Sequence, residues 1–175
     1  LESPCVEIHI ISGLGGGTGS GCFLDVCYMI RSIVERIKEA VIFGYFFMPD
    51  VNLDKIPFES INVRNNIMNN GYAAMQELDY CMRLPENGGS FDQIYPNHRV
   101  IKWDRPPVDL CHLICAADAK GSVFPDGYNY AIETAAEYIM GFLSETGEMI
   151  NHEHVAKFCS MIHSINENKK IGSEM

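Results

Sequence analysis

A glycine-rich stretch near the start of the chain, Gly13-Leu14-Gly15-Gly16-Gly17-Thr18-Gly19-Ser20-Gly21, constrains the fold more than any other feature. It follows a loosely alternating apolar segment over residues 6–12 and precedes an apolar pattern at helical spacing from Cys22 onward. In the order strand, turn and helix, the first N–H groups of the helix stay free, and the helix dipole adds positive charge there. Because glycine carries no Cβ, a phosphate can approach such a backbone closely. The stretch therefore predicts a phosphate-binding turn, to which Thr18 and Ser20 add hydroxyl groups.

Two common phosphate motifs do not account for this stretch. A Walker loop requires a Gly-Lys-Ser/Thr end, and no lysine lies in the stretch. The dinucleotide fingerprint Gly-x-Gly-x-x-Gly begins at Gly13 and Gly15, but Thr18 stands at the position of its third glycine. A tight turn that binds nothing is the simpler alternative, although five glycines in the seven residues 15–21 are costly to order for a turn alone.

The composition indicates a folded protein of one domain over residues 1–175, with 47% hydrophobic residues. A net charge of -10 argues against electrostatic contact with nucleic acid or an anionic membrane. No apolar run is long enough for membrane insertion. The seven cysteines are an odd number, and most lie in regular apolar patterns, which predicts free, buried thiols in a reducing cytoplasm. The chain opens at Leu1 rather than Met, and we interpret it as an excised piece.

Strand and helix patterns alternate along the chain. Strands are predicted at 6–12, 41–48 and 108–116, with a short antiparallel or edge strand at 100–103. Helices are predicted from Cys22, over 63–82, from about residue 128, and over 155–165, with an irregular segment at 49–61 and a turn-rich excursion at 85–96. This alternation predicts an α/β fold with a three-layer, Rossmann-like, mostly parallel sheet.

Ligands of open parallel sheets bind beyond the carboxyl ends of the strands. The segment after Pro49 leaves the sheet at the same edge as the glycine-rich stretch, so Asp50 and Asp54 are candidates for ribose contacts. Aspartates that only cap turns are the alternative interpretation. Two His/Cys groups, at 111–115 and at 152–163, lack convincing spacing for zinc, and no metal site is predicted.

The segment GGGTGSG at Gly15–Gly21 resembles the signature loop of the tubulin/FtsZ superfamily. The helix after it, the apolar strand ending at Pro49, the Asn-rich helix, and a strand into the 118–121 loop follow in the family's order. The run Asn70 to Tyr80 is most similar to the bacterial tubulin-like branch. The resemblance covers about residues 6–143 and implies an incomplete tubulin/FtsZ nucleotide-binding domain that lacks its N-terminal part.

The resemblance implies a site for GTP or GDP, with Mg²⁺ as a further candidate. Gly15, Gly16, Gly17, Thr18, Gly19, Ser20 and Gly21 match the loop around the phosphates, and residues 49–54 take the place of the ribose-side loop. Tyr128 matches the aromatic residue on which guanine stacks, with Asn129 as the nearest amide. Asp118 and Lys120 stand where the family tends to place a guanine-reading asparagine. Ile132 departs from the family's Asn or Asp one turn after the aromatic residue, so base specificity stays open.

The same resemblance implies GTP hydrolysis and self-association into filaments by the full-length chain. In the family, acidic residues after the core helix activate water for the next subunit's nucleotide. Here Glu145, Glu148, Glu153 and Glu167 are available but stand in no recognisable motif, so no catalytic residue is assigned. Two alternatives remain: a scaffolding module without catalysis, and a Rossmann-like enzyme that binds a phosphorylated metabolite.

Overall fold

The computed structural model describes residues 6–37, 40–96, 98–118, 120 and 122–143. The chain divides into two compact units, residues 1–132 and residues 133–175. The fold described below is that of the first unit. The last helix of that unit continues through residues 133–143, which are assigned to the second unit. The predicted helix at 155–165 and the four candidate glutamates lie outside the described residues.

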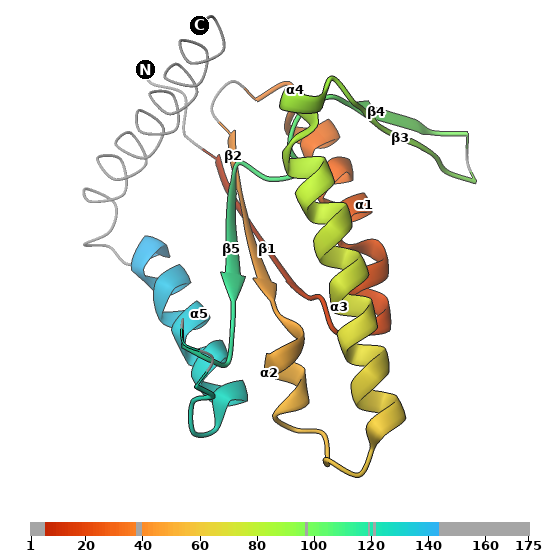
Figure 1. Ribbon diagram of the computed structural model, residues 1–175. Helices are drawn as coiled ribbons and strands as arrows, with labels where there is room; N and C mark the ends of the chain where they lie inside the picture. The colour runs from red at the N-terminus through yellow and green to blue at the C-terminus, as the bar shows by residue number, and fades with distance from the viewer. Residues whose placement is uncertain (1–5, 38–39, 97, 119, 121, 144–175) are drawn as a thin grey trace, which may run out of the picture. The chain divides into compact units, whose positions relative to one another are not determined.

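The first unit is built on a three-stranded parallel sheet in the order β1-β2-β5 (Figure 1). β1 spans Val6–Gly13, β2 spans Ala40–Phe47 and β5 spans Leu110–Ile114. In the register, Gly13 lies opposite Phe47, and Phe47 lies opposite Ile114, so the three strands end at one level. The predicted mixed α/β fold with a parallel sheet is confirmed. We call the end of the sheet at Gly13, Phe47 and Ile114 the carboxyl edge.

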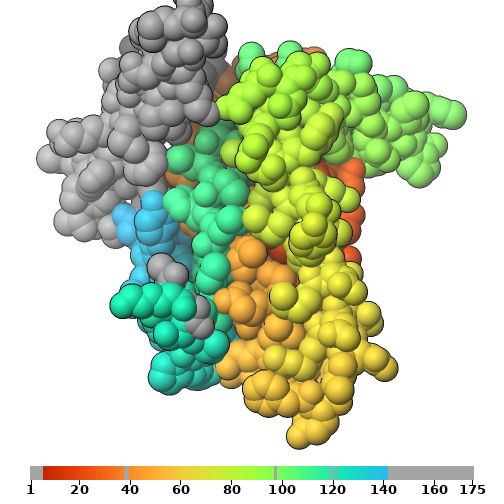
Figure 2. Space-filling view, viewed as in Figure 1, coloured from red at the N-terminus to blue at the C-terminus, as the bar shows by residue number. Residues whose placement is uncertain are grey.

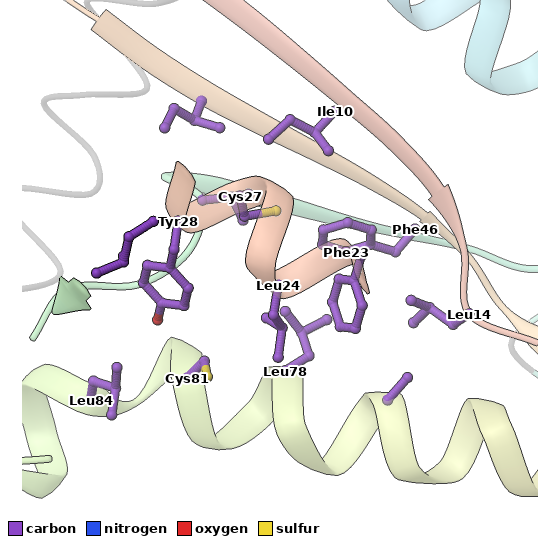
Figure 3. Packing of buried hydrophobic residues seen from close by; sticks show 14 residues of the cluster. Ile10, Leu14, Phe23, Leu24, Cys27, Tyr28, Phe46, Leu78, Cys81 and Leu84 are labelled. Carbon is purple, nitrogen blue, oxygen red and sulfur yellow. The ribbon is translucent and has the colours of Figure 1, made fainter. Parts of the chain in front are cut away.

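Helices α1 (Gly17–Val34) and α3 (Ile61–Met82) cover one face of this sheet (Figure 1). Figure 3 shows α1 between the strands and α3, with the core packed on both of its sides. The buried residues of this core come from β1, β2, α1, α3 and the segments that follow, and include Ile10, Phe23, Leu24, Cys27, Tyr28, Ile42, Phe46, Leu78 and Cys81. Burial of such side chains contributes about 1.5–3 kcal/mol each.

The helical spacing of the apolar residues predicts one buried stripe after the glycines, and this prediction was partly wrong. The stripe consists of Phe23, Val26, Cys27, Ile30, Val34 and Ile37. Val26 and Ile37 are each 40% exposed, whereas Leu24 and Tyr28 are buried. Ile37 lies beyond the end of α1 at Val34. Because α1 packs against strands on one side and α3 on the other, its buried positions include Leu24 and Tyr28 beside Phe23 and Cys27. In α3 the predicted Ala74 and Leu78 are buried, and Gly71 and Cys81 join them.

The excursion between α3 and β5 is more regular than its turn-rich sequence indicated. A short helix α4 (Leu84–Asn87) leads into β3 (Phe91–Ile94), which pairs antiparallel with β4 (Val100–Trp103). The antiparallel strand predicted at 100–103 is confirmed, but its partner β3 was missed. The Trp103 indole N–H donates to Ser32 Oγ at 2.9 Å, which ties this hairpin to α1.

Two further helices begin at the carboxyl edge. α2 (Pro49–Leu53) follows β2 directly, with Pro49 in its first turn, where a missing N–H costs nothing. The prediction of an irregular segment at 49–61 was therefore wrong at its start. α5 (Gly127–Leu143) follows the loop after β5. Its Ala131 is buried together with Val51 and Ala116, while the predicted core residue Ile132 is 40% exposed.

The thiols are free among the described cysteines, but not all are buried as predicted. Cys27 and Cys81 are buried, Cys111 is half-buried, and Cys22 and Cys115 are exposed. Cys22 lies in the second turn of α1, and Cys115 directly follows β5 at the carboxyl edge. Among the described residues, no helix is both long and apolar enough to cross a bilayer.

Candidate functional site

The glycine-rich stretch forms both the turn after β1 and the first turns of α1. The helix begins at Gly17, with Gly16 in an extended conformation before it, rather than at Cys22 as predicted. The hydroxyl of Ser20 donates to the Gly16 carbonyl, and the Ser20 N–H reaches the same oxygen at 3.3 Å. The Cys22 thiol lies 3.0 Å from the Thr18 carbonyl. These contacts supply the helical bonding that extends α1 into the glycines.

The start of α1 is left without a side-chain cap. Among the described residues no side chain caps its first turn, and by helix geometry the N–H groups of Gly17, Thr18 and Gly19 have no acceptor within the helix. The preceding turn is fixed, because the Leu14 N–H donates to the Phe47 carbonyl at 2.9 Å. Gly16, Gly17 and Thr18 are exposed. A row of free donors at the positive end of an 18-residue helix is thus open to an anion.

The glycines of this stretch serve two different purposes. A Cβ on Gly15 would lie 2.8 Å from Ile67 and 3.3 Å from the Pro49 Cα, and one on Gly19 would overlap the Gly13 carbonyl oxygen. These two glycines are required by packing. A Cβ on Gly16, Gly17 or Gly21 would meet nothing within 4 Å. The fold does not need glycine there, so close approach of a ligand is the remaining physical reason for it.

Two residues of α2 bring orphaned oxygens to the same edge. Asp50 Oδ2 accepts the Ala116 N–H at 2.7 Å, which joins α2 to the segment after β5. Asp50 Oδ1 and Asn52 Oδ1 are buried without a hydrogen-bond partner in the part of the chain that the structure describes. Asn52 Oδ1 lies 3.1 Å from the place of a Cβ on Gly15, beside the glycine-rich stretch. Buried acceptors of this kind are costly unless a donor arrives, and ligand hydroxyls would supply one.

Asp50 was predicted from the sequence, but Asn52 was not. Asn52 stands two residues after Asp50 in a segment that was expected to be irregular, and no sequence pattern marked it as a ligand contact. Asn70 was also missed as a contact: its amide donates to the Gly15 carbonyl at 3.3 Å, so the Asn-rich helix α3 supports the turn. Arg64 holds the end of α2 instead of a ligand, donating to the carbonyls of Leu53 at 3.0 Å and Ile56 at 2.8 Å.

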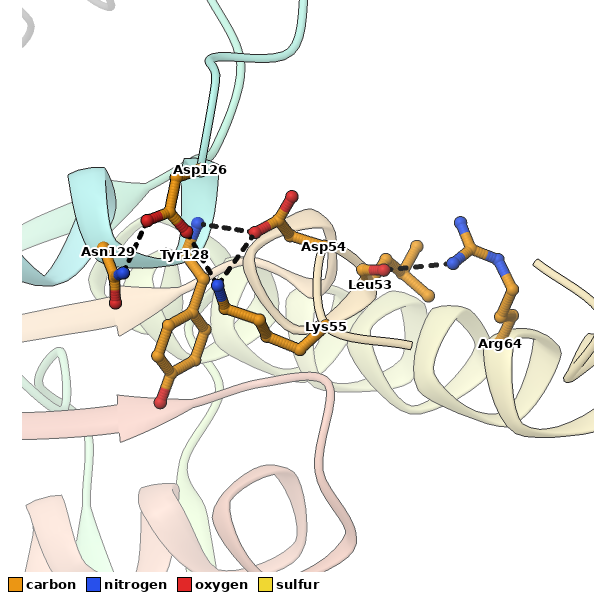
Figure 4. Close-up of polar contacts among 7 residues, drawn as sticks. All are labelled: Leu53, Asp54, Lys55, Arg64, Asp126, Tyr128 and Asn129. Carbon is orange, nitrogen blue, oxygen red and sulfur yellow. Dashed lines mark hydrogen bonds and ion pairs between the residues drawn. The ribbon is translucent and has the colours of Figure 1, made fainter. Parts of the chain in front are cut away.

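The start of α5 brings the second group of predicted residues together (Figure 4). The Tyr128 N–H donates to Asp54 Oδ2 at 3.2 Å, so Asp54 caps α5 from the end of α2. Lys55 Nζ lies 2.7 Å from Asp126 Oδ1 and 5.3 Å from the centre of the Tyr128 ring. Asn129 donates to the other oxygen of Asp126 at 2.6 Å. Lys55 and Asp126 had no role in the sequence interpretation.

The charges of this cluster stabilise one another. The hydrogen bond from Lys55 is the main cause that holds the pKa of Asp126 below its usual value, and the bond from Asn129 adds to it. The same bond to Asp126 is the main cause that raises the pKa of Lys55. Both side chains are about half exposed, at 48% for Lys55 and 54% for Asp126, so the pair is accessible to a ligand.

Asp118 stabilises its own turn in this structure. Its Oδ1 accepts the N–H groups of Lys120 and Ser122 at 2.8 and 2.9 Å. Asp118 thus caps its own turn, and a base contact by Asp118 stays a prediction. Lys120, in the same turn, is exposed.

A groove of about 370 Å³ lies between α1, α3 and β3 and includes Ser20 and Gly21 of the glycine-rich stretch. Its other lining residues are Leu24, Asp25, Glu77, Tyr80, Cys81, Ser90, Phe91, Asp92 and Gln93. Asp25, an acidic residue of α1, accepts the Tyr95 hydroxyl at 2.5 Å. That bond and desolvation raise the pKa of Tyr95, with desolvation the larger cause. Nowhere among the described residues do three or more His, Cys, Asp or Glu side chains gather to hold a metal ion.

The surface at the carboxyl edge is continuous. In Figure 2 the residues of α2, in orange, lie at the surface between the yellow start of α3 and the teal segment that leads into α5. The register of the strands puts the glycine-rich stretch, α2 and the segment that leads into α5 at the same end of the sheet.

A comparison with known families gives a match over nearly the whole chain. The family model described as "Tubulin like" matches residues 1–171. No curated protein and no solved structure matches the chain.

Proposed function

Because the chain belongs to the tubulin-like family, we propose that it binds a guanine nucleotide along the carboxyl edge of the β1-β2-β5 sheet. The phosphates lie at the start of α1, the ribose beside α2, and the base on Tyr128 at the start of α5. This places the three parts of one ligand on three segments that leave the same sheet edge.

The observation that carries the proposal is the open start of α1. The free N–H groups there face solvent, and Gly16 and Gly17 are glycines where the fold itself tolerates a side chain. A phosphate would satisfy these donors and interact favourably with the helix dipole. Thr18, exposed in the first turn, would add a hydroxyl donor.

The orphaned oxygens of α2 support the ribose position. Asp50 Oδ1 and Asn52 Oδ1 are acceptors without donors among the described residues, and ribose hydroxyl groups are donors. Tyr128 packs against the buried cluster of Val51, Ala116 and Ala131 and so offers a fixed ring for stacking.

In the full-length protein, we expect the bound nucleotide to be GTP, and its hydrolysis to accompany assembly into filaments. The loop amides would stabilise charge on the phosphoryl group, and a carboxylate of a neighbouring subunit would orient water. Mg²⁺ would enter on the phosphates and keep several water ligands, as this cation commonly does. The start of α1 contributes backbone donors to the phosphates in this arrangement.

The test is nucleotide binding by the full-length protein, measured for GTP, GDP and ATP by calorimetry. The variant is Gly17→Ala combined with Thr18→Val, which adds a methyl group where a phosphate would approach and removes the hydroxyl. The expected result is at least a roughly ten-fold loss of GDP affinity, equal to one or two hydrogen bonds to a charged group.

The matched control is Gly141→Ala, which adds the same methyl group to a helix at a position with nothing within 4 Å. It should leave nucleotide affinity unchanged. If the wild-type protein binds no nucleotide, the proposal is wrong, and the chain is better described as a scaffolding module. If a phosphorylated metabolite binds in preference to nucleotides, the Rossmann-like enzyme alternative gains support.

A further inference from the structure

The strongest unassigned feature at this edge is the charged pair beside the Tyr128 ring. Lys55 Nζ is 2.7 Å from Asp126 Oδ1 and 3.6 Å from Asp54 Oδ2, and it lies over the Tyr128 ring at 5.3 Å from its centre (Figure 4). An ammonium donor and a carboxylate acceptor thus stand together next to an aromatic face.

The pair is held in place but not sealed off. The second oxygen of Asp126 accepts from the Asn129 amide at 2.6 Å, and the Asp126 carbonyl accepts the Tyr130 N–H at 3.0 Å. Tyr128 is fixed by its N–H bond to Asp54. Both charged side chains remain about half exposed, so a ligand can replace their mutual ion pair at little cost in free energy.

A purine stacked on Tyr128 would displace the Lys55 ammonium from above the ring, and the edge of the base would then meet the ammonium and the Asp126 carboxylate. Guanine carries an acceptor at O6 and an amino donor at N2, whereas adenine carries an amino donor at N6 and nothing at C2. Lysine can only donate, and an ionised aspartate can only accept. The pair is therefore complementary to guanine, while adenine would place its amino group against the ammonium and leave the carboxylate without a partner.

Two other positions considered for the base are less suited. Ile132, one turn after Tyr128 in α5, has no polar group. The Oδ1 of Asp118 already accepts two N–H groups of its own turn. Lys55 and Asp126 thus supply the donor and the acceptor that stand beside the ring in this structure.

We infer that Lys55 and Asp126 determine base specificity: Lys55 donates to O6 and Asp126 accepts from the amino group at N2 of a guanine stacked on Tyr128. This rests on the proposed function, since it needs a nucleotide at the carboxyl edge. On binding, the ion pair between the two residues is exchanged for one contact from each to the base.

The experiment compares binding of GDP, ADP, IDP and XDP to the full-length wild-type protein and to two variants, Asp126→Asn and Lys55→Met. The wild type should bind GDP about ten- to a hundred-fold more tightly than ADP, and more tightly than IDP, which lacks the amino group at C2. Asp126→Asn should weaken GDP binding and strengthen XDP binding, because the amide can donate to the carbonyl that xanthine carries at C2. Lys55→Met should reduce the preference for GDP over ADP.

The matched control is a second exposed ion pair, Lys102 with Asp92, at 2.9 Å in the β3–β4 hairpin. Lys102→Met and Asp92→Asn should leave the GDP:XDP and GDP:ADP ratios unchanged. A gain of XDP binding by Asp126→Asn supports the inference, since loss of structure alone would not produce it.

Three results would overturn it, and they are distinguishable from failure of the proposed function. If GDP binds to the wild type but IDP binds equally well, the contact of Asp126 to N2 is wrong, and this result requires no variant. If both variants keep the wild-type ratios, the pair does not read the base, although the nucleotide proposal stands. If the wild type binds none of the four nucleotides, both proposals fail.

Discussion

The helices α1 and α5 both begin at the carboxyl edge after strands of the same sheet, but their first turns are completed differently. At α1 no side chain caps the helix, and Gly16 precedes it. At α5 the N–H of Tyr128 donates to Asp54, and Asp126 is paired with Lys55. The start of α1 is open and carries no charged side chain, whereas the start of α5 is closed by carboxylates.

Because of this difference, the two helix starts favour ligand groups of different charge. Free N–H groups and the helix dipole favour an anion at α1. At α5 the carboxylates of Asp54 and Asp126 already occupy the positive end and would repel a phosphate. The aromatic ring and the donor–acceptor pair there suit a neutral base instead. The contrast therefore sets the orientation of the proposed nucleotide along the carboxyl edge, with its phosphates at α1 and its base at α5.

The largest expected effect is on stability, from Gly19→Ala. Its Cβ would overlap the Gly13 carbonyl oxygen, which is backbone and cannot rotate away. We expect a loss of about 2–3 kcal/mol in the free energy of unfolding, typical of overpacking. Urea unfolding followed by circular dichroism measures it.

Gly17→Ala is the matched control, two residues away in the same helix, with open space around its Cβ. It should raise the free energy of unfolding by about 0.5 kcal/mol, because alanine has less conformational entropy to lose than glycine. If both variants were equally stable, the division into packed and open glycines would be wrong.

A smaller effect is expected from Asp54→Ala, which removes the cap of α5. Loss of a capping side chain costs about 1 kcal/mol. Asp54→Asn keeps an oxygen that can accept the Tyr128 N–H and should retain most of the stability. Thermal unfolding of the two variants beside the wild type gives the comparison. An Asp54→Ala protein as stable as the wild type would mean that α5 starts without help from α2.

Much of this architecture could be predicted because it depends on local patterns. The apolar run at 41–48 has the composition of a strand buried in a parallel sheet, and it forms β2. The strand predicted before the glycines and the helix predicted at 63–82 rest on the spacing of apolar residues in the same way. They form β1 and α3. The turn that we propose to bind phosphate was located by its glycines, although the sequence did not show which of them are required by packing.

The remainder depends on contacts between distant segments, which no local pattern encodes. Lys55 and Asp126 are 71 residues apart, and they meet because α2 and α5 begin at one sheet edge. Asp50 and Ala116 are 66 residues apart and meet for the same reason. The early start of α1 was missed because glycine has poor helix propensity. In the structure, the Ser20 hydroxyl donates to the Gly16 carbonyl, and Gly19 packs closely on the Gly13 carbonyl, where a larger residue would not fit.

The smallest expected effect concerns the two exposed thiols near these helix starts, Cys22 in α1 and Cys115 before α5. Desolvation is the main cause that raises the pKa of the Cys115 thiol, and the Asp50 carboxylate adds to it. Because the thiolate is the reactive form, alkylation of Cys115 should reach half its maximal rate above the pH typical of a free thiol. Asp50→Asn removes the negative charge but keeps an oxygen for the Ala116 N–H, so it should move the Cys115 profile to lower pH. Peptide mass spectrometry after timed alkylation gives the two rates separately, with Cys22 as the internal reference for access of the reagent. Identical Cys115 profiles in the wild type and in Asp50→Asn would contradict the placement of the Asp50 carboxylate beside the segment that leads into α5.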